Sequence, residues 1–497
     1  MKNKIFILSV FIMLINFIGC PGDKTKTSGV INEYFFNRSV TGEITISAYD
    51  SMNYKNYLEE AARAFEELYP GTKVNVETFS AMPEIRTGGS GNMTMQSIQI
   101  QDDPQSRTDY LNRLNTSIMS GQGADIFAMD IIPLQKFIES GNLENLEDYM
   151  TLDPAFNKSE YRQNILDASK YLNGMWFLPV DYLFNYFAYD STLVPAGIAA
   201  NFGAGKAWST DDLFKTGVPL YDGSYKLFNA TDFDRGLNGM FYQMFNENYE
   251  KFVNLKEGRA NFQDGAFANL LETVRDYGQK GYIPRAITGE QSAGRVMQMM
   301  SIDAPRDRFF FKLNSQFSLL TQYLRSTNRM IMMGSAGNVM SNEDDDLVAG
   351  IQANADGSVP YRYNLAFGIN SGSKNKETAW AFIKFLLSKE MQLSTNLNMT
   401  GLPLNNEARA QKAETVFSGL LGPAGMESAL NEQNSLLLRE YLSVMESLSD
   451  LINSYSVRDR YITDLTAQDI QFYIDGSRSA QETARVLQNK ADLYLSE

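Results

Sequence analysis

The chain contains no histidine, and this absence excludes a large part of enzyme chemistry. Without an imidazole there is no serine-histidine triad, no histidine-ligated zinc and no imidazole general base. Catalysis would have to rest on carboxylates, Lys or Tyr, and the 59 acidic residues leave that route open. The sequence therefore predicts neither a metal site nor a cofactor, and it favours a binding protein over an enzyme.

Cysteine is nearly absent as well, and the single one, Cys20, follows an apolar segment at the start of the chain. A basic start with two lysines leads into an almost wholly apolar run, residues 5–18, which ends at Gly19-Cys20. A spanning helix needs about 20 apolar residues, so this shorter run is typical of a secretion signal. The sequence predicts a signal peptide over residues 1–19.

Cys20 stands directly after a small residue at the expected cut point, which resembles the bacterial lipobox. In that motif the cysteine is diacylated and becomes the new N-terminus. Phe17 departs from the pattern, because Leu, Val or Ile usually stands there. We expect lipidation at Cys20, a tether over residues 20–42, and an exported protein anchored to the cell membrane, facing the periplasm or the cell exterior.

Basic residues are fewer than acidic ones, 44 against 59, which gives a formal net charge of -15. Loss of residues 1–19 removes two lysines and no acid, so the charge moves from -15 to -17. Such a chain is not attracted to nucleic acid or to an anionic membrane surface, so membrane association is expected through the lipid anchor only. By the same argument we expect a bound solute to be neutral or cationic.

No second apolar run reaches membrane length, yet 43% of the residues are hydrophobic and the chain is too long for one core. Two lobes are expected. Residues 44–48 and 74–76 alternate as on strands, and residues 58–69 between them keep the spacing of one helix face, which predicts a parallel α/β unit. Residues 80–109 lack periodicity and predict a loop insertion. A β-prone run at 176–189, broken by Pro179, predicts a crossing between lobes.

Several segments in this order resemble the extracellular solute-binding proteins of ABC importers, the family that includes maltodextrin- and other oligosaccharide-binding proteins. The resemblance covers residues 43–497. The segments that carry it are 123–127 (GADIF) with 141–143 (GNL), 173–179 (NGMWFLP) with Tyr186 and Tyr189, 207–209 (AWS) with Asp212, 366–369 (AFGI) with 376–380 (KETAW), and 474–484 (IDGSRSAQETA).

The resemblance implies an α/β, periplasmic-binding-protein-like fold of type II, with two interleaved lobes and three hinge crossings. The expected lobes are residues 43–180 plus 358–402 and residues 181–357 plus 403–497. It also implies a monomer that captures a small-molecule solute, a sugar, between the lobes and delivers it to the membrane subunits of an ABC permease. A sugar site requires polar groups for hydroxyls and aromatic rings for C–H faces.

By position in the matching segments, we expect ligand contacts from loops after strands and from the first crossing. The predicted residues are Tyr49, Asp50, Asp130, Asp181, Tyr182 and Phe184, followed by Asp232, Phe233, Gly337, Asn338 and Asn405. For each tyrosine, packing at a strand end is the alternative, and for each carboxylate a helix cap or a solvated loop. The three tryptophans, Trp176, Trp208 and Trp380, are predicted to be core residues.

Two other functions stay open on the sequence alone. One is an exported glycosidase with two carboxylates roughly 5 to 10 Å apart across the sugar. The other is a sensor or adhesin lipoprotein that keeps the fold without transport.

Overall fold

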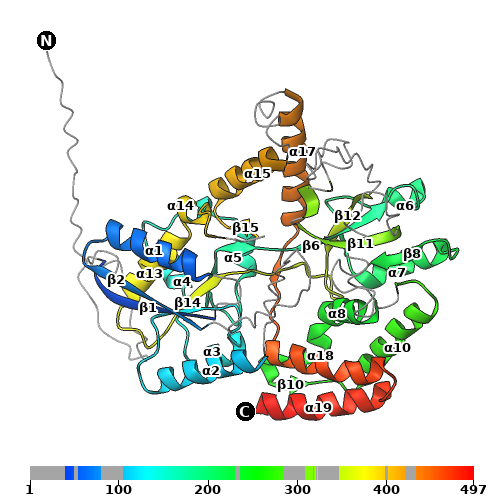
Figure 1. Ribbon diagram of the computed structural model, residues 1–497, viewed down its shortest axis with the longest axis horizontal. Helices are drawn as coiled ribbons and strands as arrows, with labels where there is room; N and C mark the ends of the chain where they lie inside the picture. Colours follow the sequence, from blue (N-terminus) through cyan, green and yellow to red (C-terminus); the bar gives the residue numbers. More distant parts are fainter. Residues whose placement is uncertain are drawn as a thin grey trace, which may run out of the picture.

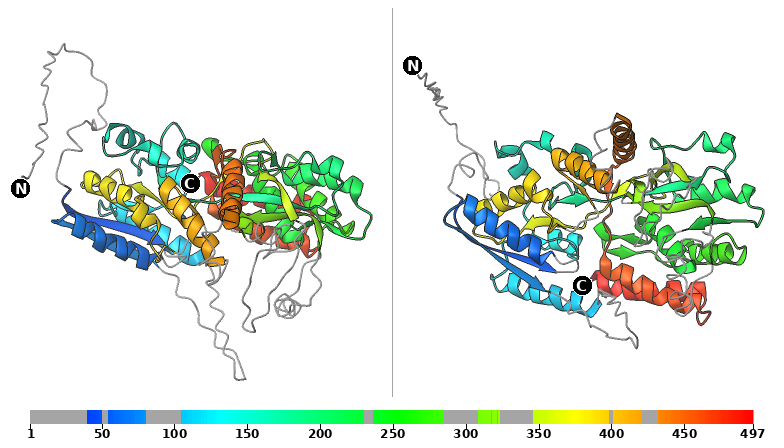
Figure 2. Two further views of the ribbon diagram at one scale, coloured as in Figure 1. Left: turned by 90° about the horizontal axis from the view of Figure 1, so that it is seen from above. Right: turned by 45° about the horizontal axis from the view of Figure 1, so that its top comes forward.

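The computed structural model describes residues 40–49, 54–79, 104–229, 236–284, 308–316, 318–320, 322, 346–397, 401–420 and 432–496. The strands form two five-stranded sheets, each with its own helices, that lie side by side (Figure 1). Two further views show the same two groups of strands and helices side by side (Figure 2). Among the described residues, no helix combines the length and the apolar character needed to cross a bilayer.

The first sheet has the strand order β2-β1-β3-β14-β4. These strands are β1 (Gly42–Tyr49), β2 (Thr72–Phe79), β3 (Ile126–Ala128), β14 (Ala366–Ile369) and β4 (Leu178–Pro179). β1 runs parallel to β2 and β3, and β14 runs antiparallel to β3 and β4. Helix α1 (Lys55–Leu68) connects β1 to β2, which confirms the predicted strand-helix-strand unit.

Both faces of the first sheet are buried, because alternate side chains of its strands point to opposite sides. Ile126 and Ala128 join a core with α1 and α13 (Lys376–Leu386), whereas Phe127 joins a second core with α2 (Pro104–Met119) and α3 (Leu134–Glu139). Trp380 on α13 is 1% exposed, which confirms its predicted place in the core.

The second sheet has the order β7-β12-β6-β11-β8. Its strands are β7 (Ala207–Trp208), β12 (Asp346–Gln352), β6 (Asn185–Asp190), β11 (Phe309–Ser315) and β8 (Lys226–Asn229), and the helices around it are α7 (Thr210–Gly217), α8 (Leu237–Glu247), α10 (Ala266–Gln279), α18 (Arg460–Ile474) and α19 (Ala480–Ser496). Helix α7 begins with a capping box: Ser209 Oγ accepts from Asp212 N at 3.2 Å, and Asp212 Oδ2 accepts from Ser209 N at 3.1 Å.

The shorter elements complete the described chain. They are α4 (Glu147–Leu152), α5 (Gln163–Ala168), α6 (Ala196–Ala199), α9 (Tyr249–Phe252), α14 (Lys389–Gln392), β9 (Val253–Asn254) and β10 (Arg259–Ala260), with 3-10 turns at Lys158–Glu160, Val218–Leu220 and Leu255–Glu257.

The chain crosses between the sheets three times, as the predicted fold requires. The first crossing runs from β4 through β5 (Asp181–Tyr182) to β6, and the second returns from β12 through β13 (Pro360–Tyr361) to β14. The third runs from α17 (Glu432–Ser449) through β16 (Ser454–Tyr455) to α18. The crossings pair with their neighbours, since β5 is antiparallel to β15 (Leu402–Pro403) and β13 is parallel to β16.

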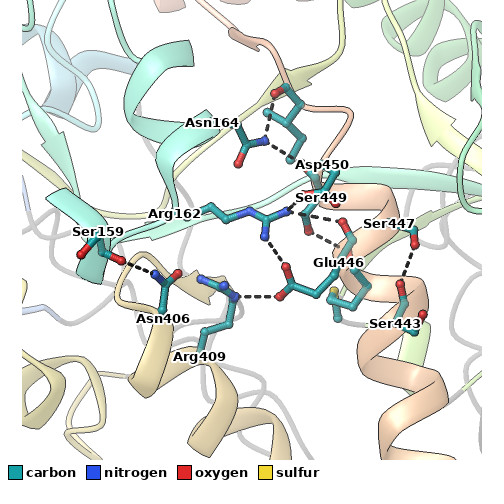
Figure 3. A network of polar contacts seen from close by, with 12 residues as sticks. Ser159, Arg162, Asn164, Asn406, Arg409, Ser443, Glu446, Ser447, Ser449 and Asp450 are labelled. Carbon is teal, nitrogen blue, oxygen red and sulfur yellow. Dashed lines mark hydrogen bonds and ion pairs between the residues drawn. The ribbon is translucent and has the colours of Figure 1, made fainter.

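Phe417 on α15 (Asn406–Leu420) and Leu448 on α17 are buried in a core that also holds residues of the first sheet, of the crossings, and of β6 and β12. A polar network ties them there (Figure 3): Glu446 accepts from Arg409 Nε at 3.1 Å and also from Arg162, just before α5. This placement differs from the predicted lobe change near residue 402, because the chain reaches the second sheet's helices only after residue 449.

Candidate functional site

The crossings bring distant segments together at the junction of the two lobes. Leu183 on the first crossing and Arg362 on the second exchange backbone hydrogen bonds of 2.7 and 2.9 Å. On the third crossing, Ser456 N donates to Tyr361 O at 3.1 Å. Side chains near residues 185, 362 and 455 are therefore held next to one another although they lie far apart in the sequence.

Three aromatic rings form one group at this junction. Tyr363 and Tyr455 stack with ring centroids 5.3 Å apart and planes 10° apart, and Phe177 lies 5.2 and 5.0 Å from them. Tyr455 Oη donates to Tyr363 Oη at 3.1 Å, and Tyr363 Oη donates to Met129 O at 3.1 Å. Both tyrosines are half-buried, and burial raises the pKa of Tyr455 to about 12, so both stay neutral hydrogen-bonding groups.

A chain of polar side chains runs from these rings into the second lobe. Arg362 Nη2 donates to Asn185 Oδ1 at 3.0 Å, and Asn185 Nδ2 donates to Gln352 Oε1 at 2.8 Å. Gln352 Nε2 in turn donates to Glu247 Oε1 at 3.0 Å. Arg362 is exposed and the two amides are half-buried, so this chain ends on an accessible surface.

Glu247 anchors the buried end of the chain. Its carboxylate accepts from Thr210 N at 2.9 Å, from Thr210 Oγ1 at 2.8 Å and from Gln243 Nε2 at 2.6 Å. Burial nevertheless raises the pKa of Glu247 to about 7, because desolvation of the charge outweighs these hydrogen bonds. The carboxylate fixes the orientation of Gln352 and, through it, of Asn185.

Arg458 completes the group from the third crossing. The backbone N of the next residue, Asp459, donates to Tyr249 Oη at 3.0 Å and fixes the segment. The pairing of Tyr361 with Tyr455 holds the segments of Arg362 and Arg458 side by side. Burial lowers the pKa of Arg458 to about 10, and the charge of Arg362 acts in the same direction. We call the six accessible residues the junction site: Asn185, Gln352, Arg362, Tyr363, Tyr455 and Arg458.

Of the residues predicted from the sequence, Asp130 lies next to the junction site. It follows β3 and is half-buried. Burial is the main cause of the raised pKa of Tyr363, and the charge of Asp130 adds to it. Tyr49, at the end of β1, is 1% exposed, and its ring lies 5.8 Å from that of Tyr110 and 6.2 Å from that of Phe79.

The predicted residues of the first crossing are buried and hold the crossing together. Asp181 accepts from the backbone N of Asn364 at 2.9 Å and of Leu365 at 3.2 Å, which ties the first crossing to the second. Tyr182 and Phe184 are 0% and 1% exposed and lie in the core. Their side chains present no accessible surface to a ligand in this conformation, because they pack on the inward face of the crossing.

Asn405 caps a helix instead of lining the junction. Its Oδ1 accepts from Ala408 N at 3.0 Å in the first turn of α15, and the residue is 6% exposed. Five further predicted site residues lie outside the described residues: Asp50, Asp232, Phe233, Gly337 and Asn338. Cys20 also lies outside them.

None of the six residues of the junction site was predicted from the sequence. A signal was present in residues 360–364 (PYRYN) and 454–458 (SYSVR), where aromatic and polar residues alternate just before a recognised strand or helix. Alternation of this kind is typical of a strand with one accessible side. What the sequence could not show was that the two segments pair with each other.

The comparisons with known proteins agree with this architecture. A family model described as bacterial extracellular solute-binding protein matches residues 60–416, well over half of the chain. The chain belongs to this family, which the order of sequence segments had predicted. The family is one of exported binding proteins.

Solved structures of two-lobed binding proteins share the fold. An ABC substrate-binding protein of Listeria monocytogenes, in complex with cycloalternan, has a TM-score of 0.50 at 15% identity and covers 92% of this chain and 99% of its own. A family 1 extracellular solute-binding protein of Alicyclobacillus acidocaldarius has a TM-score of 0.50 at 16% identity, with the same coverage. A periplasmic solute-binding protein of Pectobacterium atrosepticum has a TM-score of 0.51 at 16% identity, again with 92% and 99% coverage.

Proposed function

We propose that the protein binds a saccharide at the junction site and delivers it to the membrane subunits of an ABC permease. The observation that carries this proposal is the stacked pair Tyr363 and Tyr455 beside Arg362 and Asn185, at the point where the lobes meet. A sugar has C–H faces that pack on aromatic rings and hydroxyls that need both donors and acceptors. The cycloalternan ligand of the Listeria protein supports an oligosaccharide as the solute.

We further propose that the ligand favours closure of the lobes about the three crossings. A ligand that touches both lobes stabilises the closed state by its differential affinity for the two states. We place lobe 1 at residues 43–180 plus 358–449 and lobe 2 at residues 181–357 plus 460–497, with the third crossing between them. The assignment of α15 and α17 to lobe 1 is supported by the contacts of Glu446 with Arg409 and with Arg162, which precedes α5.

We propose that the exported protein acts as a monomer held at the membrane by a lipid on Cys20. The support is the basic start, the apolar run at residues 5–18 and the Gly19-Cys20 pair. Mass spectrometry of membrane-extracted protein should find a diacylated Cys20 at the new N-terminus, and Cys20→Ser should leave the protein unprocessed or released. An unmodified Cys20, or a cut elsewhere, would contradict the anchor.

Calorimetric titration with a panel of oligosaccharides tests the binding proposal. We expect Tyr455→Ala to lose affinity by about 1 to 3 kcal/mol, by analogy with measured base-aromatic stacking, and to lose less stability in urea than a core variant because Tyr455 is only half-buried. Trp380→Ala is the matched core variant and should lose roughly 3 to 5 kcal/mol of stability. We expect Tyr182→Ala to behave like Trp380→Ala, since Tyr182 is as deeply buried.

The same panel addresses the two alternatives. Release of shorter saccharides during incubation would establish a glycosidase instead of a transport protein. Binding without turnover, combined with normal uptake in cells that lack the gene, would favour a sensor or adhesin. Normal affinity of Tyr455→Ala for every bound saccharide would remove the junction site from the proposal.

A further inference from the structure

The two arginines of the junction site have no acidic partner in the described part of the chain. The Arg362 guanidinium donates one hydrogen bond, to the neutral amide of Asn185, and the Arg458 guanidinium makes no hydrogen bond or ion pair with any described residue. By contrast, Arg308 pairs with Asp190 and Arg409 with Glu446.

The arrangement is electrostatically unfavourable as it stands. Like charges that are near each other and partly shielded from water repel more strongly than they would in bulk solvent. Glu247 is the nearby acid whose charge acts on Arg458, but its oxygens are occupied by donors from Thr210, Gln243 and Gln352. The repulsion between the two guanidinium groups is therefore not relieved within the described part of the protein. Unfavourable electrostatics of this kind are typical of a ligand-binding site.

The surroundings point to the kind of ligand. Arg362 is exposed and Arg458 is half-buried, so both guanidinium groups are accessible to a ligand. The stacked rings of Tyr363 and Tyr455 lie on the same crossings as the two arginines. Cations and a flat apolar surface side by side suit a sugar ring that carries an anionic group.

We propose that the solute is an acidic saccharide, and that Arg362 and Arg458 bind its carboxylate while the tyrosine rings contact the sugar. This inference rests on the proposed saccharide-binding function. It departs from the neutral or cationic solute expected from the net charge of the chain. Net charge is spread over the whole surface, and salt screens it within roughly 8 to 10 Å, so two neighbouring arginines control the local field.

Titration calorimetry with matched probes tests the proposal on the full folded protein. The probes are trigalacturonate, its fully methyl-esterified form, which keeps the rings and removes the charge, and neutral maltotriose. We expect trigalacturonate to bind roughly 10- to 100-fold more tightly than the ester. Arg458→Gln and Arg362→Gln should each reduce the affinity for the acid by a similar factor and leave that for the ester unchanged.

Arg485→Gln is the control, because Arg485 is an exposed arginine on α19 that pairs with Glu482. It should leave all three affinities unchanged. If maltotriose or the ester binds as tightly as the acid, or if Arg458→Gln and Arg362→Gln bind the acid normally, the acidic-ligand inference is wrong and the saccharide proposal stands. If no saccharide binds to the folded protein, the proposed function fails and the inference fails with it.

Discussion

Two buried carboxylates stabilise the junction of the lobes, and their contribution to the free energy of unfolding depends on pH. Asp181 and Glu247 are both buried, and burial raises their pKa values to about 6 and about 7 in spite of several donated hydrogen bonds. Asp181 joins two crossings, and Glu247 orients the amides of the junction site. Both side chains are buried and act through the residues they position.

The raised pKa of Glu247 predicts a specific pH dependence of stability. Below its ordinary pKa of 4.5 the group is protonated in both states, and above about 7 it is ionised in both. Between these values the native state holds a proton that the unfolded state has lost, so the free energy of unfolding falls as pH rises. The fall due to this group is on the order of 3 kcal/mol.

Urea unfolding of wild type and Glu247→Gln between pH 4.5 and 8 measures this effect. The variant loses an acceptor oxygen and should be less stable at acidic pH, but its stability should fall less steeply with pH. The change in slope is therefore the readout. Glu147→Gln, on the exposed pair with Lys170, is the control and should follow the wild-type profile. Parallel profiles for wild type and Glu247→Gln would show that the buried carboxylate titrates normally.

At the scale of elements, α15 and α17 depend on one carboxylate (Figure 3). Glu446 on α17 faces Arg409 on α15 and Arg162 before α5, and the two arginine side chains are only 10% and 11% exposed. Asp450 accepts a further hydrogen bond of 2.6 Å from Arg162. Because the arginines are shielded from water, removal of their shared partner leaves poorly solvated charges.

We therefore expect Glu446→Gln to lower the free energy of unfolding by about 1 to 3 kcal/mol, a range reduced from that of a fully buried pair because Glu446 is 37% exposed. Glu482→Gln breaks an exposed pair with Arg485 and should change stability by less than about 0.5 kcal/mol. Urea unfolding of both variants measures whether the contacts of Glu446 contribute more to stability than an exposed ion pair does. Equal, small effects would mean that the Figure 3 network does not hold the helices.

Some of the helices and strands could be predicted from local sequence patterns. Local signals were sufficient for the β1-α1-β2 unit, whose alternating strands and helix face were visible in the sequence. Along the first crossing, Leu178, Val180, Tyr182, Phe184, Tyr186 and Ala188 all enter one core. This alternation was visible in the sequence, and it would have assigned Tyr182 to the core and Asn185 to the other face.

The junction site needed information that no local pattern contains. Tyr455 is placed against Tyr363 by the parallel pairing of β13 with β16, two strands of two residues each. Strands this short carry almost no periodicity, and their register depends on the packing of whole lobes around them. Sequence order could identify the family, but it could not show which polar residues of the crossings face each other.

At the scale of the whole molecule, the lobes also touch through helices away from the crossings. Arg107 on α2 forms an ion pair with Asp464 on α18, and Lys136 on α3 donates to Tyr494 O at 2.9 Å on α19. The Lys136 ammonium lies 3.8 Å from the centre of the Tyr494 ring. A hinge motion about the crossings would break these contacts, whereas the core shared by the crossings would stay packed.

This arrangement predicts that Asp464→Ala opens the lobes without unfolding them. The Arg107 side chain is 6% exposed and that of Asp464 is 25% exposed, so loss of the pair should weaken the closed state by at least about 1 kcal/mol. The radius of gyration of the ligand-free variant, measured by small-angle scattering, should exceed that of the wild type. Asp492→Ala, on α19 beside Gln488, changes an exposed acid and should leave it unchanged.

Ligand binding provides the second half of this test. If only the closed state binds, opening by about 1 kcal/mol weakens the apparent affinity of any bound saccharide by at most about fivefold, and saturating ligand restores the wild-type radius of gyration. An Asp464→Ala protein that is expanded even at saturation would have lost its lobe packing altogether. A variant with unchanged size and unchanged affinity would show that the Arg107–Asp464 pair does not contribute to closure, and that the crossings and the ligand alone set the angle between the lobes.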